Sequence, residues 1–191
     1  MDEPSGATVM TDSSGNGHDA PLPAAVRPGG GKYWFSGKAP VIVPHGAGLN
    51  PGRADFSFAV RVRRTGGYAD PNLIQKGQVD APNGYYKIDY FQGQVVCTLK
   101  GDGGTAVIGL PANISDKFSH TIRCSKTATQ MRLDVDPGTP RAKFGTKAVT
   151  IGSIANIKPL TLGGKTNCSS VDACDPFTGL MVWARVDFRP L

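Results

Sequence analysis

The chain has 191 residues, of which 39% are hydrophobic and 19% charged, and its formal net charge is +6. This composition excludes an intrinsically disordered chain, and no apolar run approaches the roughly 20 residues of a membrane-spanning helix. The basic balance suits an acidic polysaccharide as a partner, whereas the lack of basic runs with interleaved aromatic residues argues against nucleic acid.

The first six residues, MDEPSG, have neither the basic nor the apolar segment of a signal peptide. Such a start is typical of the interior of a longer chain. We therefore expect a fragment of a larger parent polypeptide, with its export signal upstream.

Short β-rich runs follow one another along the chain, without helical periodicity. Each run is bounded by Gly, Pro, Asn or Asp, which favour turns. The strands expected in the first half span residues 32–35, 41–43, 56–63, 72–75 and 85–90.

The run 56–63, FSFAVRVR, alternates apolar and polar side chains, as a half-buried antiparallel strand does. This alternation places Arg61 and Arg63 on one face. A solvated strand edge that discourages edge-to-edge pairing and a surface that attracts an anionic partner explain the two arginines equally well.

The strands expected in the second half span residues 94–99, 106–109, 118–124, 131–135 and 179–186, of which the third and fourth should pair as neighbours. About a dozen strands joined by short turns indicate an all-β fold of two stacked antiparallel sheets. Without a linker or an internal repeat, residues 1–191 are expected to form one domain.

Four cysteines suggest two disulfide bonds. Cys97 and Cys124 lie in expected strands, whereas Cys168 and Cys174 are close together in a polar loop. No Cys-x-x-Cys spacing or neighbouring histidine favours a metal site instead. Disulfides indicate an oxidising compartment, so we expect a secreted or extracellular protein.

A series of motifs resembles one known family in order along nearly the whole chain. These are DEPSG at 2–6, DSSGNGH at 12–18, NLIQKG at 72–77, GYYK at 84–87, HTIRC at 120–124, KPLTLGGK at 158–165, and the segments around Cys168, Cys174 and FTG at 177–179. The chain thereby resembles the laminin-G-like, concanavalin-A-like jelly rolls of bacterial, actinobacterial-type secreted proteins. The resemblance implies a two-sheet antiparallel jelly-roll sandwich that binds carbohydrates or proteins.

The loop from Asp12 to Asp19 is the candidate calcium site, because Asp12, Asn16 and Asp19 offer the oxygen ligands that calcium prefers. A tight turn in which Asp and Ser side chains bond their own backbone needs no ion. In the family, an Asp of the final strand helps to hold the ion. Val182 stands at that position here, which weighs against calcium.

Flat aromatic rings are the residues on which a sugar would stack. The candidates are Tyr68, in a Gly-rich loop, and three tyrosines of one expected strand, Tyr85, Tyr86 and Tyr90, of which the last two share one face. Trp34 and Trp183 lie in expected strands, where packing into the core is the default.

Catalytic patterns are weak. The Glu-x-Asp-x-x-Glu pattern of concanavalin-like hydrolases does not occur, and Asp134 and Asp136, which should share a strand face, precede a Pro-Gly turn. His18, His45 and His120 occur in separate segments, without a zinc-binding pair or a nucleophile elbow.

These observations favour a non-catalytic recognition module for a polysaccharide or glycoprotein. The alternatives are a hydrolase or lyase acting on polysaccharide, and a structural or adhesion spacer that binds no small ligand. The fold alone does not decide among them.

Overall fold

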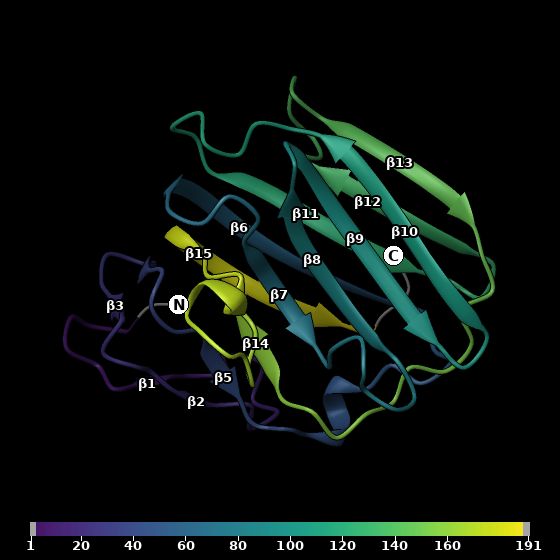
Figure 1. The fold of residues 1–191 in the computed structure, drawn as a ribbon, viewed down its shortest axis with the longest axis horizontal. Coiled ribbons are helices and arrows are strands. Elements are labelled where there is room, and N and C mark those ends of the chain that lie inside the picture. The colour runs from purple at the N-terminus through teal and green to yellow at the C-terminus, as the bar shows by residue number, and fades with distance from the viewer. Residues whose placement is uncertain (1–2, 189–191) are drawn as a thin grey trace.

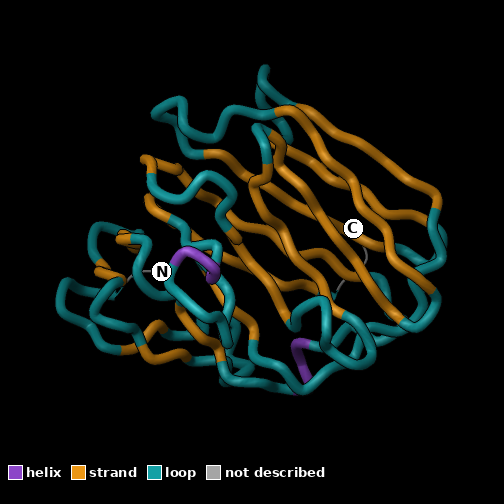
Figure 2. The backbone as a smooth tube through the Cα atoms, in the orientation of Figure 1, coloured by secondary structure: helices purple, strands orange, loops and turns teal. Residues whose placement is uncertain are grey.

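Two antiparallel sheets packed face to face build this protein, as a computed structural model that describes residues 3–188 shows (Figure 1). Strands and the loops that join them make up nearly the whole tube in Figure 2, and the described part of the chain has only two short 3-10 turns, Ala47–Leu49 and Asp172–Cys174. The predicted all-β jelly-roll sandwich is confirmed.

The first sheet has six strands in the order β10-β9-β8-β7-β14-β5. Their bounds are β5 Val41–Val43, β7 Asn72–Lys76, β8 Tyr85–Phe91, β9 Gln94–Gly101, β10 Gly104–Pro111 and β14 Leu160–Leu162. The strands predicted at 72–75 and 85–90 are β7 and β8, and they pair antiparallel with a register shift between Asn72 and Ile74.

The second sheet has seven strands in the order β13-β12-β11-β6-β15-β4-β3. Their bounds are β3 Val26–Pro28, β4 Tyr33–Ser36, β6 Phe56–Gly66, β11 His120–Lys126, β12 Gln130–Val135, β13 Lys143–Ala148 and β15 Thr178–Asp187. A two-stranded ribbon of β1 (Val9–Met10) and β2 (Ala20–Pro21) precedes them.

The core lies between the sheets, because alternate residues of each strand point inward. From β6 the core receives Phe56, Phe58, Val60 and Val62, all nearly inaccessible to solvent. Cys97 on β9 bonds Cys124 on β11, so a buried disulfide joins the two sheets. The second predicted disulfide, Cys168–Cys174, closes a small loop between β14 and β15.

Several sequence predictions are corrected by the structure. Because β6 lies between β11 and β15, its arginines do not protect a sheet edge. Phe118 lies outside β11 and is 56% exposed. Strand β13, which the sequence did not predict, is mostly exposed and therefore lacks a clear apolar alternation.

Candidate functional site

The outer face of the seven-stranded sheet carries a cluster of arginines. Val60 and Val62 point into the core, so Arg61 and Arg63, which alternate with them, point to the outside. This part of the sequence prediction is confirmed. The outward positions of the neighbouring strands follow from the pairing register.

Six arginines from five strands lie on this surface. In the strand register, Arg27 of β3 is paired with Trp34 of β4. Ala59 of β6 is paired with Arg123 of β11 on one side and with Arg185 of β15 on the other. We call this surface the arginine face, formed by Arg27, Arg61, Arg63, Arg123, Arg132 and Arg185.

Small side chains separate the arginines at the middle of the sheet. Ala59 lies between Arg123 and Arg185, whose strands are therefore two positions, or roughly 10 Å, apart. In the next row Ser57 and Ser125 are partners. Short side chains therefore occupy the positions between the arginines, so the guanidinium groups are spread over the surface.

Both tryptophans of the chain belong to the same surface. Trp183 of β15 is the register partner of Arg61, and its side chain is partly exposed. Trp34 is 39% exposed and lies between the buried residues Tyr33 and Phe35. The expectation that the tryptophans pack in the core is therefore wrong. They offer flat rings beside the arginines.

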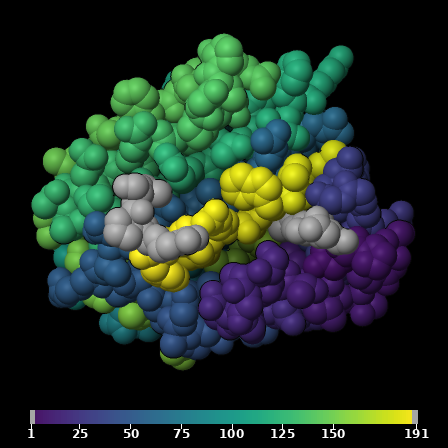
Figure 3. All heavy atoms as spheres, turned by 180° about the vertical axis from the view of Figure 1, so that it is seen from behind, coloured from purple at the N-terminus to yellow at the C-terminus, as the bar shows by residue number. Residues whose placement is uncertain are grey.

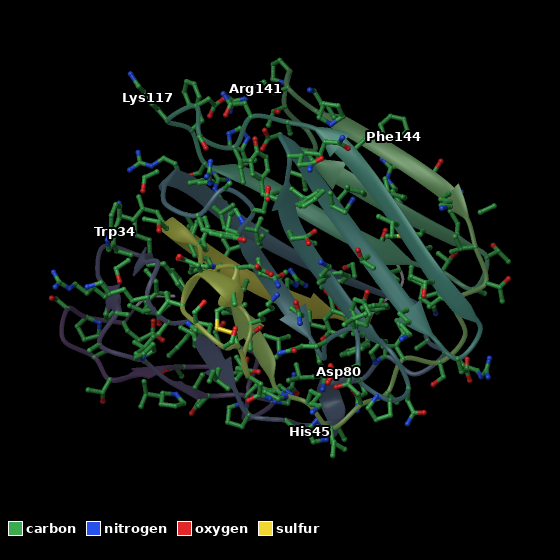
Figure 4. The ribbon with its side chains drawn as sticks, viewed as in Figure 1. Trp34, His45, Asp80, Lys117, Arg141 and Phe144 are labelled. Carbon is green, nitrogen blue, oxygen red and sulfur yellow. A yellow bond between two sulfur atoms is a disulfide. The ribbon has the colours of Figure 1, made fainter. Side chains whose placement is uncertain are left out.

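The arginine face extends from β3 at one edge of the sheet to β12, next to the opposite edge strand β13. Figure 4 shows Trp34 at the β3–β4 side of the molecule and Phe144 at the opposite, β13 side. From behind, strand β15, drawn in yellow, crosses this face between the green β11–β13 region and the purple N-terminal segment (Figure 3).

Two carboxylates partly compensate the six arginines among the outward strand residues that the structure describes. Asp134, only 3% exposed, contacts Arg132 at 2.7 Å and Arg123 at 3.2 Å. The hydrogen bond to Asp134 raises the pKa of Arg132 above its ordinary value. Asp187 pairs with Arg185. The surface therefore keeps an excess of positive charge.

Some arginine donors have no protein acceptor within the described residues. The Nε atoms of Arg63 and Arg123 are buried there without a hydrogen-bond partner. No ion pair joins Arg61 to a carboxylate in residues 3–188. Guanidinium groups of this kind can bind carboxylate or sulfate through two parallel hydrogen bonds.

The predicted calcium loop is a tight turn held by its own carboxylates. Asp12 Oδ1 accepts a hydrogen bond from the Ser14 amide at 3.0 Å and Oδ2 from the His18 amide at 3.1 Å, while Asp19 Oδ1 accepts from the Asp12 amide at 2.7 Å. Burial raises the pKa of Asp12, but these hydrogen bonds outweigh it and the pKa lies below its ordinary value. Asn16 bonds Ser14 instead.

The oxygen atoms of this loop are poorly arranged to coordinate a calcium ion. Both oxygens of Asp12 and one of Asp19 already accept backbone hydrogen bonds. Within residues 3–188 no group of three or more His, Cys, Asp or Glu side chains converges on a possible metal position. The geometry favours the ion-free turn.

The predicted tyrosine platform is divided between surface and core. Tyr86 is fully buried, and its hydroxyl donates to the Leu49 carbonyl at 3.0 Å. Tyr90 is 9% exposed and belongs to the core. Tyr68 lies in the loop after β6, where its carbonyl accepts a hydrogen bond from Arg64, whose guanidinium carbon is 5.5 Å from the centre of the Tyr90 ring.

The acidic residues considered for catalysis lie apart. Asp134 is on the arginine face, whereas Asp136 follows β12 with φ 52° and bonds the buried His120, so the expectation that they share a strand face is wrong. His120 lies between Asp136 and Asp116, each 2.7 Å from one ring nitrogen. Neither nitrogen is free to take a proton from a substrate.

For three aromatic residues that were predicted on the wrong side of a strand, the neighbouring residues in the sequence indicate the correct side. Tyr86 alternates with Lys87 and Asp89, so its face is the apolar one. Trp183 is two residues from Arg185, and Trp34 is two residues from Lys32, which places both indoles on polar strand faces.

Comparison with known proteins supports the architecture. No family model and no curated protein matches the chain. Among solved structures, the binding domain of Paraclostridial Mosquitocidal Protein 1 matches with a TM-score of 0.71 and 17% identity, over 94% of this chain and 46% of that one.

Two further structures have the same arrangement of sheets. Domains LG4-5 of the mouse laminin α1 chain give a TM-score of 0.56 and 16% identity, over 70% of this chain and 35% of that one. The CBM40 of Ruminococcus gnavus IT-sialidase bound to α2,3 sialyllactose gives 0.55 and 16%, over 74% and 79%. At these identities the likeness establishes the fold alone. The chain spans less than half the length of the first two structures.

Proposed function

We propose that this chain is an extracellular, non-catalytic recognition module that binds an acidic polysaccharide through the arginine face. The observation that carries the proposal is the gathering of six arginines and two tryptophans on one sheet face. Arginine pairs with the carboxylates or sulfates of such a polymer, and an indole ring covers the apolar face of a sugar.

The extended shape of the surface suits a polymer. The arginines occupy five strands from β3 to β12, so successive acidic groups of one chain can meet different guanidinium groups. The CBM40 with bound sialyllactose and the toxin binding domain are recognition modules on related folds, which supports a binding role by analogy.

An extracellular location agrees with the two disulfides. Within the described residues no helix is both long and apolar enough to cross a membrane. In this proposal the module belongs to a larger secreted polypeptide, and residues 1–191 are one of its domains.

Isothermal titration with polygalacturonate, and with neutral dextran as the matched polymer, tests this function. We expect polygalacturonate to bind and dextran to bind far more weakly at the arginine face. The affinity for polygalacturonate should fall steeply between about 50 and 200 mM salt, because bound counterions are released on association.

Two substitutions locate the binding surface. Arg61→Gln should weaken binding about tenfold or more, since a hydrogen bond to a charged group contributes about 1.5–3 kcal/mol. Trp183→Ala should weaken it roughly two- to tenfold. Arg53→Gln removes the same charge from an exposed arginine that pairs with Asp102, away from this face, and should leave binding unchanged.

Equal affinities for Arg61→Gln, Arg53→Gln and the unaltered protein would refute the assignment of the surface. If the unaltered protein binds neither polygalacturonate nor chondroitin sulfate, an acidic polysaccharide is refuted as the ligand. A reducing-end assay on the same polymers separates recognition from a hydrolase or lyase, which would release new chain ends.

A further inference from the structure

A polar hollow lies on the outside of the other sheet. Strand β8 sends Tyr86, Ile88 and Tyr90 into the core, so Tyr85, Lys87 and Asp89 point outward. The hollow has a volume of about 180 Å³, and its lining includes Asn72, Gln75, Tyr85, Lys87, Lys165 and Asp175. A water molecule needs only roughly 10–15 Å³ of such space.

One wall of the hollow comes from Lys165 and Asp175, which flank the loop that the Cys168–Cys174 disulfide closes. The chain on both sides of this loop is fixed to β7, because the Asn72 amide donates to the Asp175 carbonyl at 2.9 Å and the Gly163 amide to the Leu73 carbonyl at 3.0 Å. Across the hollow, Gln78 Nε2 donates to the Thr166 carbonyl at 2.6 Å. The wall therefore has a defined position against the sheet.

A buried acceptor without a partner lies at the base of the hollow. Gln75 Nε2 donates to the Gly77 carbonyl, so Gln75 Oε1 is the atom that faces Asn72. That oxygen accepts from Asn72 Nδ2 at 2.6 Å, which fixes the orientation of the Asn72 amide. Asn72 is only 1% exposed, and its Oδ1 has no hydrogen-bond partner among the described residues.

A second acceptor without a partner is beside the first. Asn72 and Asp89 are direct partners in the β7–β8 register, and Asp89 Oδ1 is also buried without a hydrogen-bond donor in residues 3–188. Its other oxygen pairs with Lys87. Burial raises the pKa of Asp89, and the nearby Asp175 carboxylate adds to the increase against the effect of Lys87. Two buried oxygens, on paired residues of neighbouring strands, thus have no hydrogen-bond donor among the described residues.

The charges around the hollow balance. Lys87 pairs with Asp89, and Lys165 Nζ is 2.8 Å from Asp175 Oδ2. Two ammonium and two carboxylate groups leave no net charge, unlike the arginine face. A ligand with a charge of its own would have to displace one of these ion pairs, whereas a hydroxyl group can donate to a carboxylate and accept from an ammonium at the same time.

We propose that this hollow is a second binding site, separate from the arginine face, that takes a neutral sugar unit through adjacent hydroxyl groups. One hydroxyl donates to Asn72 Oδ1 and its neighbour to Asp89 Oδ1. The lysine ammonium groups donate to the hydroxyl oxygens, and Tyr85, 8% exposed, lines the site as a flat ring.

NMR titration with free glucose, galactose, mannose and N-acetylglucosamine, one at a time, tests the proposal. The side-chain amide signals of Asn72 and Gln75 should shift in a saturable way with at least one of these sugars. Glucuronate and glucosamine are the charged counterparts and should bind at least tenfold more weakly than the best neutral sugar.

Three variants assign the signal to the hollow. Asp89→Asn, which keeps the shape of the side chain, should reduce affinity at least tenfold. Lys165→Ala, which lies beside the disulfide loop and is partly exposed, should also reduce affinity at least tenfold, and it serves as the test if Asp89→Asn disturbs folding. Asp102→Asn is the matched control, since Asp102 is exposed and pairs with Arg53 elsewhere, and it should bind as the unaltered protein does.

The two proposed sites give distinguishable failures. Binding in the hollow should be insensitive to salt and to Arg61→Gln, and polygalacturonate binding should be insensitive to Asp89→Asn. No shift of the Asn72 and Gln75 amides with any neutral sugar means that the hollow holds water only, which overturns this proposal and leaves the arginine face untouched. Tighter binding of a charged sugar, or binding that survives both Asp89→Asn and Lys165→Ala, also overturns it.

Discussion

A buried lysine, Lys76 of β7, makes the free energy of unfolding depend on pH in the alkaline range. Lys76 is fully inaccessible, and its Nζ donates to the carbonyls of Lys158 at 2.7 Å and Asn156 at 3.1 Å, with His45 Nδ1 at 3.3 Å. Burial lowers the pKa of Lys76 from 10.5 to about 8. Three neighbouring polar groups do not fully replace the water that the ammonium loses.

The sign of the effect follows from proton binding. Between pH 8 and 10.5 the unfolded chain holds the Lys76 proton and the folded protein releases it, so the free energy of unfolding rises with pH. For these two pKa values the gain from pH 7 to pH 10 is about 2.5 kcal/mol. Below pH 8 both states are protonated, and the full cost of the buried charge is present.

Urea unfolding at pH 7, 8, 9 and 10, compared between the unaltered protein and Lys76→Met, measures this contribution. The difference between the two proteins removes the titration of all other groups, including Tyr86, whose pKa burial raises. Lys38→Met, at an exposed lysine, is the control and should follow the unaltered protein.

Parallel stability curves for the unaltered protein and Lys76→Met over this range would refute the reasoning. At pH 7, Lys76→Met removes the cost of the buried charge but leaves the carbonyls of Asn156 and Lys158 without this donor, at about 1–3 kcal/mol each. If that variant does not fold, NMR titration of the Lys76 side chain reads its pKa directly, and a value near 10.5 contradicts the prediction.

Two further predictions concern the turn and the disulfides. Millimolar calcium and a chelator should both leave the melting temperature unchanged, and a calcium-dependent rise in melting temperature would contradict the ion-free turn. Asp12→Asn should lower the free energy of unfolding by about 1 kcal/mol, because its side chain accepts more weakly from the Ser14 and His18 amides. Replacing Cys168 and Cys174 by serine should lower the free energy of unfolding in urea by about 2 kcal/mol. Replacing Cys97 and Cys124 should lower it by roughly 3–4 kcal/mol, because their disulfide closes a longer loop and so restricts the unfolded chain more. Equal losses would contradict this entropic reasoning.

The sequence by itself determined the class of fold and much of its local structure. Alternation in the run 56–63 identified strand β6 and the shared face of Arg61 and Arg63, because successive side chains of any strand point to opposite sides. The placement of the four cysteines indicated both disulfides. Recurrent turn residues bounded most of the remaining strands.

Only the tertiary structure decided which strands are neighbours. Arg27 and Arg185 are far apart in the chain and meet on one surface because β15 pairs with β4 and β4 with β3. Period-two alternation says that two residues share a face, but it carries no information about pairing between distant segments. The arginine face was therefore visible in the sequence as a single pair of arginines.

The structure also decided which face of a strand meets the core. A register shift between Met181 and Trp183 interrupts the alternation of β15, and the apolar run around it conceals which residues are outside. The acceptors of Asn72 and Asp89 became a candidate site only when β7 paired with β8 and the chain around Gly163 and Asp175 was bonded to β7. Such contacts depend on chain segments separated by many residues, whereas sequence patterns report the local backbone.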